Sequence, residues 1–295
     1  MQYSFYPGCS LEATAVHYLK SLEPVLEALD IQIEEIPDWN CCGATVASGV
    51  VGDFTQQAIT GRNLAIAEQK GNDILVACSS CYLSLATTNK RFREDEHFRN
   101  LANEALGAAG LKYNGTLRVR QILEALINDV GLEKISKRVE KPLTGLKVAG
   151  YTGCQTPRAI PWEFEDPENP HMLDKIIEAL GATLVPFPMK AKCCGSSQAV
   201  AQPDIVLDCC RDIIQCAVNN EADLIVTPCP MCQMNLDAYQ GMVNQKHGTN
   251  FETPILFITQ LMGIAFGLPA PKWALKYNIV SPEKVIAPLL RKLGA

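Results

Sequence analysis

A five-cysteine pattern that occurs twice constrains this chain more than any other feature of its sequence. In each half, a cysteine after a Tyr-x-Gly triplet is followed by a Cys-Cys-Gly triplet and then by a CxxC motif. The gaps between these landmarks are 31 and 35 residues in the first half and 38 and 34 residues in the second. The common order and spacing indicate an internal duplication. The first set comprises Cys9, Cys41, Cys42, Cys78 and Cys81; the second comprises Cys154, Cys193, Cys194, Cys229 and Cys232.

The residues around these landmarks predict an α/β fold. Short runs rich in β-branched residues, 73–76 and 223–226, lead into the CxxC motifs and indicate buried strands. Helical patterns precede them, at about 55–70 and about 204–221, and further helices are predicted to begin at 121–123 and 260–262. We therefore expect two modules related by a pseudo-twofold axis, each with a small, mostly parallel sheet and flanking helices. The cysteines are expected on loops at the strand ends, where open α/β sheets usually carry their sites.

The boundary between the modules is predicted near residue 140. We expect a first module over residues 1–140 and a second over 141–295, joined by a basic link at about 133–146 that contains helix breakers. The first module is longer after its CxxC motif, and its extra segment, 90–114, is predicted to add a helix.

Composition excludes several classes of protein. The total of 13 cysteines is odd, so complete pairing in disulfides is impossible, and clustered cysteines without an export signal favour metal or redox chemistry. A net charge of −6 argues against nucleic-acid binding. The most apolar stretch, 254–271, is interrupted by polar residues and glycines, so we expect no transmembrane segment and a cytoplasmic location.

Five thiols with an adjacent pair favour a cluster of metal atoms over a single ion. Tetrahedral zinc is saturated by four ligands, and neighbouring residues rarely both bind one ion. A cubane iron–sulfur cluster takes four thiolates, so a fifth requires an opened cluster or a bridging sulfur. Gly43 and Gly195 suit a close approach of the backbone to inorganic sulfur. Zinc at one of the two sets remains the alternative.

Three further cysteines, Cys209, Cys210 and Cys216, have no cysteine counterparts in the first half. When Asp223 is aligned with Asp73, Cys209 falls on Ile59 and Cys216 on Ile66 of the equivalent helix. Free cysteine behaves as a small hydrophobic residue, so all three are predicted to lie in the core.

With both motifs complete, essentially the whole chain resembles the tandem CCG-domain iron–sulfur proteins, the family of the B subunits of methanogen CoB–CoM heterodisulfide reductases. The resemblance implies that each cysteine set holds one noncubane [4Fe–4S] cluster. It also implies that the two clusters together reduce the CoM-S-S-CoB disulfide to coenzyme M and coenzyme B. The partners implied are a small ferredoxin-like subunit, a flavoprotein subunit, and a hydrogenase or formate dehydrogenase.

Two other functions stay open. CCG motifs also occur in electron-transfer subunits of succinate-, lactate- and glycolate-type dehydrogenases, where the chemistry belongs to a flavoprotein partner. Many of those subunits carry a ferredoxin segment, CxxCxxCxxxCP, which this sequence lacks, so a separate electron carrier is expected. A zinc-stabilised structural module is the third possibility.

The anionic coenzymes of the resembling family predict cations near the site. Arg158, Lys190 and Lys192 are close in sequence to ligands of the second set and are the candidates. His17 is near Cys9 in sequence and could donate a proton, although a lone histidine on a helix is more often a partly exposed side chain.

We predict that the anaerobically purified chain contains about eight irons and a similar amount of acid-labile sulfide, because each set is expected to hold one four-iron cluster. Counting iron, sulfide and zinc per chain checks this. Four irons with one zinc would mean that one set is structural and would contradict a mechanism with two clusters.

Overall fold

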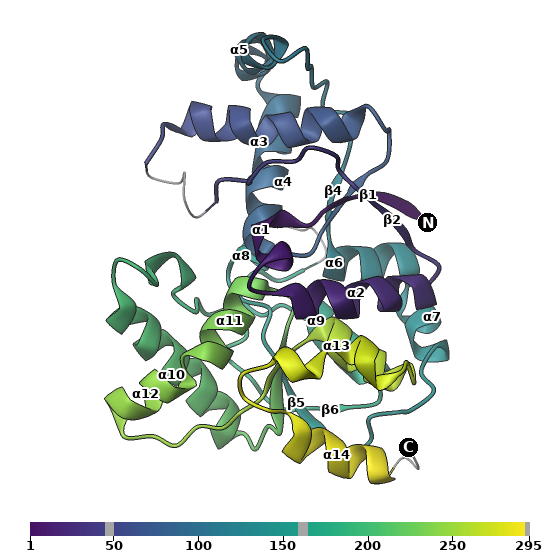
Figure 1. The fold of residues 1–295 in the computed structure, drawn as a ribbon, viewed down its shortest axis with the longest axis vertical. Helices are drawn as coiled ribbons and strands as arrows, with labels where there is room; N and C mark the ends of the chain where they lie inside the picture. Colours follow the sequence, from purple (N-terminus) through teal and green to yellow (C-terminus); the bar gives the residue numbers. More distant parts are fainter. Residues whose placement is uncertain (45–49, 159–164, 293–295) are drawn as a thin grey trace.

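The computed structural model describes residues 1–44, 50–158 and 165–292, which form two α/β modules with the same topology (Figure 1). Each module contains a four-stranded parallel sheet, with strand order β2-β1-β3-β4 in the first and β6-β5-β7-β8 in the second. The strands of the first sheet are β1 (Gln2–Tyr6), β2 (Gln32–Glu35), β3 (Ile74–Val76) and β4 (Val119–Gln121). Those of the second sheet are β5 (Lys147–Gly150), β6 (Thr183–Leu184), β7 (Leu224–Thr227) and β8 (Ile255–Phe257).

The register of the strands places the cysteines together. In the first sheet, Tyr6 at the end of β1 pairs with Val76 at the end of β3, so both chains leave the sheet at the same edge. In the second sheet, Gly150 at the end of β5 pairs with Val226. The central strands β3 and β7 are completely buried, as expected for a parallel sheet with both faces covered. The carboxyl edge of each sheet therefore carries the first cysteine and the CxxC motif of its set side by side.

Helices cover both faces of each sheet. In the first module these are α1 (Gly8–Glu12), α2 (Val16–Ala28), α3 (Asp53–Glu68), α4 (Ser79–Glu94), α5 (Glu96–Gly107), α6 (Ile122–Glu124), which continues as the π-helix η1 (Ala125–Val130), and α7 (Leu132–Lys137). In the second they are α8 (Gln155–Arg158), α9 (Met172–Ala179), the 3₁₀ turn η2 (Ser196–Gln198), α10 (Pro203–Asn219), α11 (Pro230–Ala238), α12 (Gln240–His247), α13 (Ile258–Ala265), the 3₁₀ turns η3 (Ala270–Trp273) and η4 (Leu275–Tyr277), and α14 (Glu283–Lys292).

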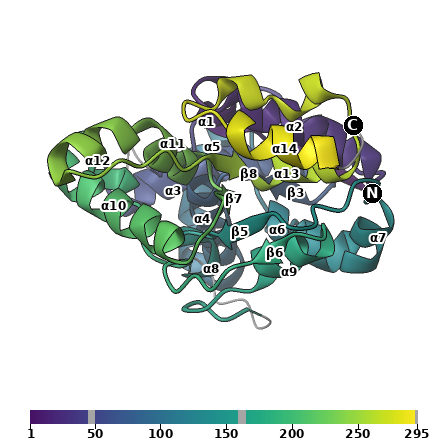
Figure 2. The same cartoon turned by 90° about the horizontal axis from the view of Figure 1, so that it is seen from below.

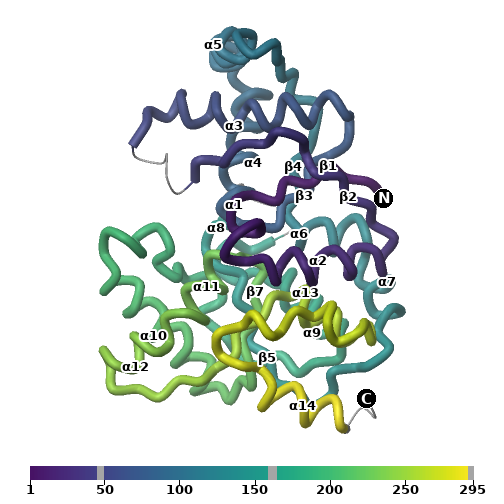
Figure 3. Tube along the Cα trace, in the orientation of Figure 1, coloured from purple at the N-terminus to yellow at the C-terminus, as the bar shows by residue number. Residues whose placement is uncertain are grey.

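The two modules contact each other reciprocally, as a pseudo-twofold axis requires. Helix α2, which follows the first strand of module one, packs on α13 of module two, while its counterpart α9 packs on α6 of module one. Likewise α1 contacts α11, and its counterpart α8 contacts α4. Figures 1 and 2 both show α2 beside α13, although these segments are far apart in the sequence. Following the trace in Figure 3 shows the two modules stacked along the long axis of the molecule.

One large apolar core crosses this interface. It contains buried residues from both sheets and from α2, α9 and α13. At its centre the ring of Tyr18 on α2 stacks on Phe257 of β8, with ring centroids 4.0 Å apart, and the Tyr18 hydroxyl donates a buried hydrogen bond of 2.8 Å to the Pro228 carbonyl. A second cluster lies between α10, α11 and the second sheet. Each module thus completes its core with helices of the other.

The predicted strands and the α/β architecture are confirmed. The helix expected at 55–70 is α3, and the one expected at 204–221 is α10. The helix predicted from residue 260 begins at Ile258, and the extra segment of the first module is shared between the end of α4 and α5.

The link between the modules differs from the sequence-based expectation because it contains a helix of its own, α7, which packs on α9. Residues 140 and 141 donate backbone hydrogen bonds to Ala265, and Leu143 donates one to Leu180, so the end of the link is fixed to the second module. The boundary near residue 140 stays a prediction. None of the helices within the described residues is long and apolar enough to cross a membrane.

Replacing Tyr18 with Phe is predicted to lower the free energy of unfolding by about 1–3 kcal/mol, because the buried Pro228 carbonyl loses its donor. Chemical denaturation under anaerobic conditions measures the change. Tyr277→Phe is the control, since that side chain is 40% exposed and its change is expected to be within about 0.5 kcal/mol of zero. Equal stability of both variants would contradict the role assigned to Tyr18.

Candidate metal centres

Each cysteine set is assembled from three loops at the carboxyl edge of its sheet. Cys9 lies in the first turn of α1, directly after β1, and its counterpart Cys154 precedes α8. The adjacent pairs lie in the loops that follow β2 and β6. Cys78 and Cys229 are the N-cap residues of α4 and α11, so both CxxC motifs occupy the first turn of a helix, where the helix dipole favours a thiolate.

The structure brings the thiols of each set together. The Sγ atoms of Cys42 and Cys81 are 3.4 Å apart, and those of Cys194 and Cys232 are 3.6 Å apart. In the second module all five thiols line one small cavity of ≈ 30 Å³, space for about two water molecules. In the first module the thiol of Cys9 acts electrostatically on Cys41, which contacts Cys42. Both sets predicted from the spacing are therefore spatial clusters.

The glycine before the first cysteine of each set makes this approach possible. A Cβ atom on Gly8 would lie 2.8 Å from the Sγ of Cys81, and one on Gly153 would lie 3.0 Å from the Sγ of Cys232. Both glycines have a positive φ, of +69° and +75°. Glycine is thus required in the Tyr-x-Gly triplets for two reasons: the positive φ of the backbone and the lack of space for a Cβ atom beside a thiol.

The tyrosine of each triplet anchors the loop that carries the adjacent pair. The Tyr6 hydroxyl donates to the Asn40 carbonyl at 2.8 Å, and the Tyr151 hydroxyl donates to the Lys192 carbonyl at 2.7 Å. Burial raises the pKa of both phenols, and the nearby thiols raise it further. The two tyrosines therefore stay neutral donors. Sequence reasoning used them as landmarks and did not predict this contact.

The backbone carbonyl of the second cysteine in each adjacent pair also accepts hydrogen bonds in both modules. Thr60 and Ser84 donate to the Cys42 carbonyl at 3.0 and 2.7 Å. The Cys194 carbonyl accepts from Asn235 at 3.1 Å and lies 3.9 Å from the Sγ of Cys210. Cys210 thus occupies the place of Thr60.

The prediction that three cysteines lie in the core is confirmed for Cys210, whose side chain is fully buried. Cys209 and Cys216 are only partly buried, although Cys216 packs against the core. The alignment of Asp223 with Asp73 placed the helix in the correct register. It could not reveal that two of the aligned positions lie near the surface of α10.

Contacts among the thiols shift their proton affinities in opposite directions. Hydrogen bonds from Cys41 and Cys81 lower the pKa of Cys42 to about 3, whereas the pKa of Cys41 is raised. In the second set, the hydrogen bond from Cys154 lowers the pKa of Cys193 to about 6. Each set therefore contains a thiol that is readily ionised, and the thiolate is the form that binds metals.

The two sets meet at the interface between the modules. Hydrogen bonding from Cys232 and from Cys78 holds the pKa of the Cys229 thiol well below its usual value, so the thiols of Cys78 and Cys229 interact across the interface. Beside this contact, Thr156 donates to the Ser79 hydroxyl at 2.5 Å, and Ser80 donates to the side chain of Gln155. Groups held by the two sets would thus be neighbours.

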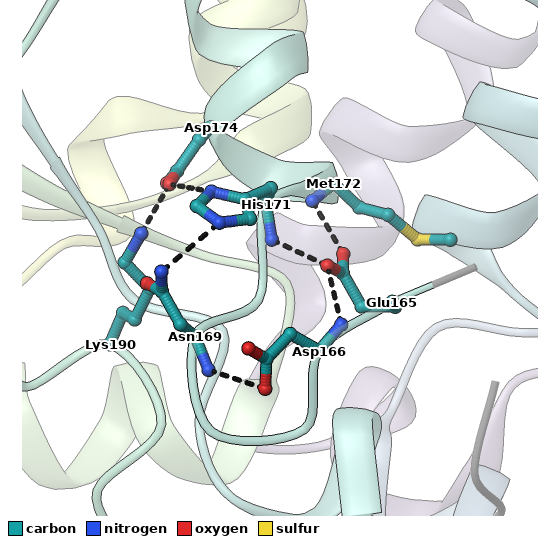
Figure 4. Close-up of polar contacts among 7 residues, drawn as sticks. All are labelled: Glu165, Asp166, Asn169, His171, Met172, Asp174 and Lys190. Atoms are coloured by element: carbon teal, nitrogen blue, oxygen red, sulfur yellow. Dashed lines mark hydrogen bonds and ion pairs between the residues drawn. The ribbon is translucent and has the colours of Figure 1, made fainter. Parts of the chain in front are cut away.

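The candidate cations of the second module are mostly engaged with acids. Figure 4 shows Lys190 bonded to Asp174, which also contacts His171 at 3.5 Å. Lys190 and Asp174 are both buried, and the Lys190 carbonyl accepts from the Gly153 N–H at 2.9 Å. Arg158 pairs with Glu168 at 2.7 Å and donates to the Ala191 carbonyl. Both side chains therefore fix the loops around the second set.

The third candidate cation, Lys192, is exposed, and its side chain has no partner among the described residues. His17 is buried, with 4% of its surface exposed, and burial lowers its pKa. The expectation of a partly exposed histidine is wrong because the ring packs against Phe257, with centroids 5.0 Å apart.

The donor chemistry of the two sets fits an iron–sulfur cluster. Every ligand is a thiol, and the N–H groups of Gly43 and Gly195 point at the Sγ atoms of Cys41 and Cys193, at 3.4 and 3.2 Å. Within the described residues, no group of three or more His, Cys, Asp or Glu side chains is arranged to hold a single metal ion. The thiols contact each other directly, so a four-iron group requires them to move apart. The ligand assignment stays a prediction.

Comparison with known proteins identifies the repeated unit. Residues 3–86 and 148–237 each match the family model of the cysteine-rich CCG domain. The 8-methylmenaquinol:fumarate reductase membrane anchor subunit of Wolinella succinogenes is 35% identical over 285 residues, 96% of this chain and 99% of that protein. The B subunit of the ferredoxin:CoB-CoM heterodisulfide reductase of Methanosarcina mazei is 30% identical, covering 96% of this chain and 95% of that protein.

A solved structure shares the fold. A hypothetical protein from Helicobacter pylori superposes with a TM-score of 0.75 at 14% identity, over 95% of this chain. The matched region is 52% of that protein, so this chain spans about half of its length.

Gly153→Ala is predicted to lower the iron content of the purified chain by about half, because a Cβ atom would press on the Sγ of Cys232. Gly71→Ala is the matched control. Gly71 has the same positive φ, +76°, but a Cβ atom there meets nothing within 4 Å, so the variant has only the backbone strain of about 1–2 kcal/mol and should keep its iron. Equal iron loss in both variants would attribute the effect to strain alone.

Proposed function

The chain belongs to the cysteine-rich CCG domain family, and we propose that it is the iron–sulfur subunit of a complex that reduces a disulfide. The substrate proposed is CoM-S-S-CoB, reduced to coenzyme M and coenzyme B. Two noncubane [4Fe–4S] clusters would be held, one by Cys9, Cys41, Cys42, Cys78 and Cys81, the other by Cys154, Cys193, Cys194, Cys229 and Cys232. The similarity to the B subunits of heterodisulfide reductases over nearly the full length supports this assignment.

The observation that carries the proposal is the complete five-thiol set in each module, with Cys78 against Cys229 where the modules meet. Reducing a disulfide takes two electrons and involves two sulfurs. An iron–sulfur cluster exchanges electrons one at a time, so two equivalent neighbouring sites match this stoichiometry. A cubane relay cluster needs four thiolates, whereas each module offers five.

The surrounding residues would hold and orient the reactants. The ten thiols bind the clusters, Tyr6 and Tyr151 fix the loops of the adjacent pairs, and the N–H groups of Gly43 and Gly195 donate to thiols. Cys9, Cys41 and Cys193 are exposed, so each set has a side open to a substrate. The cation available to an anionic group of the coenzymes is Lys192, because Arg158 and Lys190 are paired with acids.

A second function is favoured by a different observation. The relative that is 35% identical over 99% of its own length belongs to a fumarate reductase that uses a methylmenaquinol. In that setting the chain would transfer electrons for a succinate-type complex whose flavoprotein partner carries the chemistry. Lactate- and glycolate-type complexes are variants of this alternative.

The partners proposed follow from the first function. A small ferredoxin-like subunit would deliver electrons from a flavoprotein subunit, itself fed by a hydrogenase or formate dehydrogenase. The relatives named as heterodisulfide reductase subunits support a multi-subunit assembly. A cytoplasmic location is part of the proposal.

The isolated chain, purified anaerobically, is predicted to reduce CoM-S-S-CoB with a strong one-electron donor such as reduced viologen but not with a nicotinamide coenzyme. Cys42→Ala and Cys194→Ala should each abolish turnover and remove one cluster signal. Cys216→Ala is the control; it should retain both iron and activity, since its thiol is outside both sets. Activity retained in either Cys42→Ala or Cys194→Ala would contradict a two-site reaction.

Ligand perturbation separates the two functions. Coenzyme M and coenzyme B added to the oxidised protein should perturb paramagnetic signals that map to different sets. Clusters that are reduced by a quinol and perturbed by neither thiol would favour the succinate-type alternative.

A further inference from the structure

The Thr152 hydroxyl is a buried polar group without a protein partner. The side chain is 2% exposed, and its Oγ1 makes no hydrogen bond within the described residues. Leaving a buried hydroxyl unpaired is costly, and an unsatisfied group of this kind in a native protein calls for an explanation such as a redox role or a bound species. Thr152 lines the same cavity as the five thiols of the second set. The missing acceptor is therefore expected within that cavity.

The equivalent turn of the first module has no such hydroxyl. Its equivalent turn is Tyr6-Pro7-Gly8-Cys9, so proline takes the place of threonine. The two turns are otherwise alike, with the same tyrosine hydrogen bond and the same left-handed glycine beside a thiol. Proline offers neither a side-chain donor nor an N–H group. The difference at this position therefore makes the two sites chemically unequal.

The charged side chains near the two cysteine sets differ less between the modules than the sequence suggests. In the second module Lys190 is neutralised by Asp174, and Arg158 by Glu168. In the first module Asp38, which occupies the position of Lys190, is paired with Arg62. Lys192, in place of Asn40, leaves one extra exposed cation, which solvent screens. The buried hydroxyl is the larger difference.

We propose that the Thr152 hydroxyl donates a hydrogen bond to a sulfur of the cluster held by the second set and raises its reduction potential above that of the first. Hydrogen bonds to cluster sulfurs are among the determinants of these potentials, because they stabilise the more negative reduced state. An electron transferred to the two clusters would then reside mainly on the cluster of the second module. The inference rests on the proposed clusters but applies to both functions proposed.

Thr152→Val removes the hydroxyl and keeps the shape of the side chain. In a redox titration of the anaerobic protein followed by paramagnetic resonance, one of two midpoints should fall. A tenfold change in the reduction equilibrium corresponds to about 59 mV for one electron. Thr152→Ser, which keeps the donor, should restore the original midpoint. The affected signal should be the one lost in Cys194→Ala and retained in Cys42→Ala.

A matched control tests for general loosening of the fold. Thr259→Val makes the same change at a buried threonine on α13, whose hydroxyl is 2.6 Å from that of Ser21, and should leave both midpoints unchanged. If valine at 152 prevents iron uptake, Thr152→Ala removes the same hydroxyl with less volume and is titrated instead. Full iron content with unchanged midpoints in the hydroxyl-free variant would overturn the inference. Absence of iron from the unmodified chain would instead overturn the proposed clusters.

Discussion

The contact between Cys78 and Cys229 is the point on which the rest of the structure depends. These residues cap α4 and α11, and the two helices begin toward each other from different sheets. Thiols that are buried together in this way are stable only if their charges are shared or neutralised, and here donors and helix N-termini surround them. The hydrogen bond that Thr156 of α8 donates to Ser79 ties the start of α4 to the second module. The loops that follow β1 and β2, and those that follow β5 and β6, deliver further cysteines near this point.

The packing of helices of each module on the other module explains why the separation of the two sites is fixed. Helix α2 covers the interface from the first module and α13 from the second, with Ser21 and Thr259 bonded at 2.6 Å between them. Tyr18 reaches across to the Pro228 carbonyl, which immediately precedes Cys229. A displacement of one module against the other would therefore break buried hydrogen bonds and open an apolar core. The interface therefore supports the two sites from outside and fixes their separation.

Much of this arrangement could be predicted from the sequence, because the repeated order and spacing of the cysteines and the local pattern of the strands can be read without knowing which distant segments pack together. The runs before each CxxC motif gave the central strands, and the duplicated landmarks gave the two modules. Contacts between segments distant in sequence were beyond that reasoning. His17 looked like a surface residue until the structure placed Phe257 against it, and α7 was hidden in a basic stretch that reads as a linker. Lys190 likewise reads as a free cation in the sequence, and only the structure shows its buried ion pair with Asp174.

The pairs of equivalent positions that differ show how a duplicated frame can carry two unequal sites. Gly150 corresponds to Phe5, and a Cβ atom on Gly150 would lie 2.6 Å from Oδ1 of Asp174. The first module thus has a buried aromatic side chain at the position where the second leaves room for a carboxylate. Both solutions support the same turn, since the Tyr-x-Gly hydrogen bonds have nearly equal lengths of 2.8 and 2.7 Å. The recurring residues therefore hold the turn beside the thiols in both modules, while the residues that differ change the volume and polarity around it. Two clusters at a fixed separation can have different reduction potentials only if the residues that fix their positions are distinct from the residues that change their surroundings.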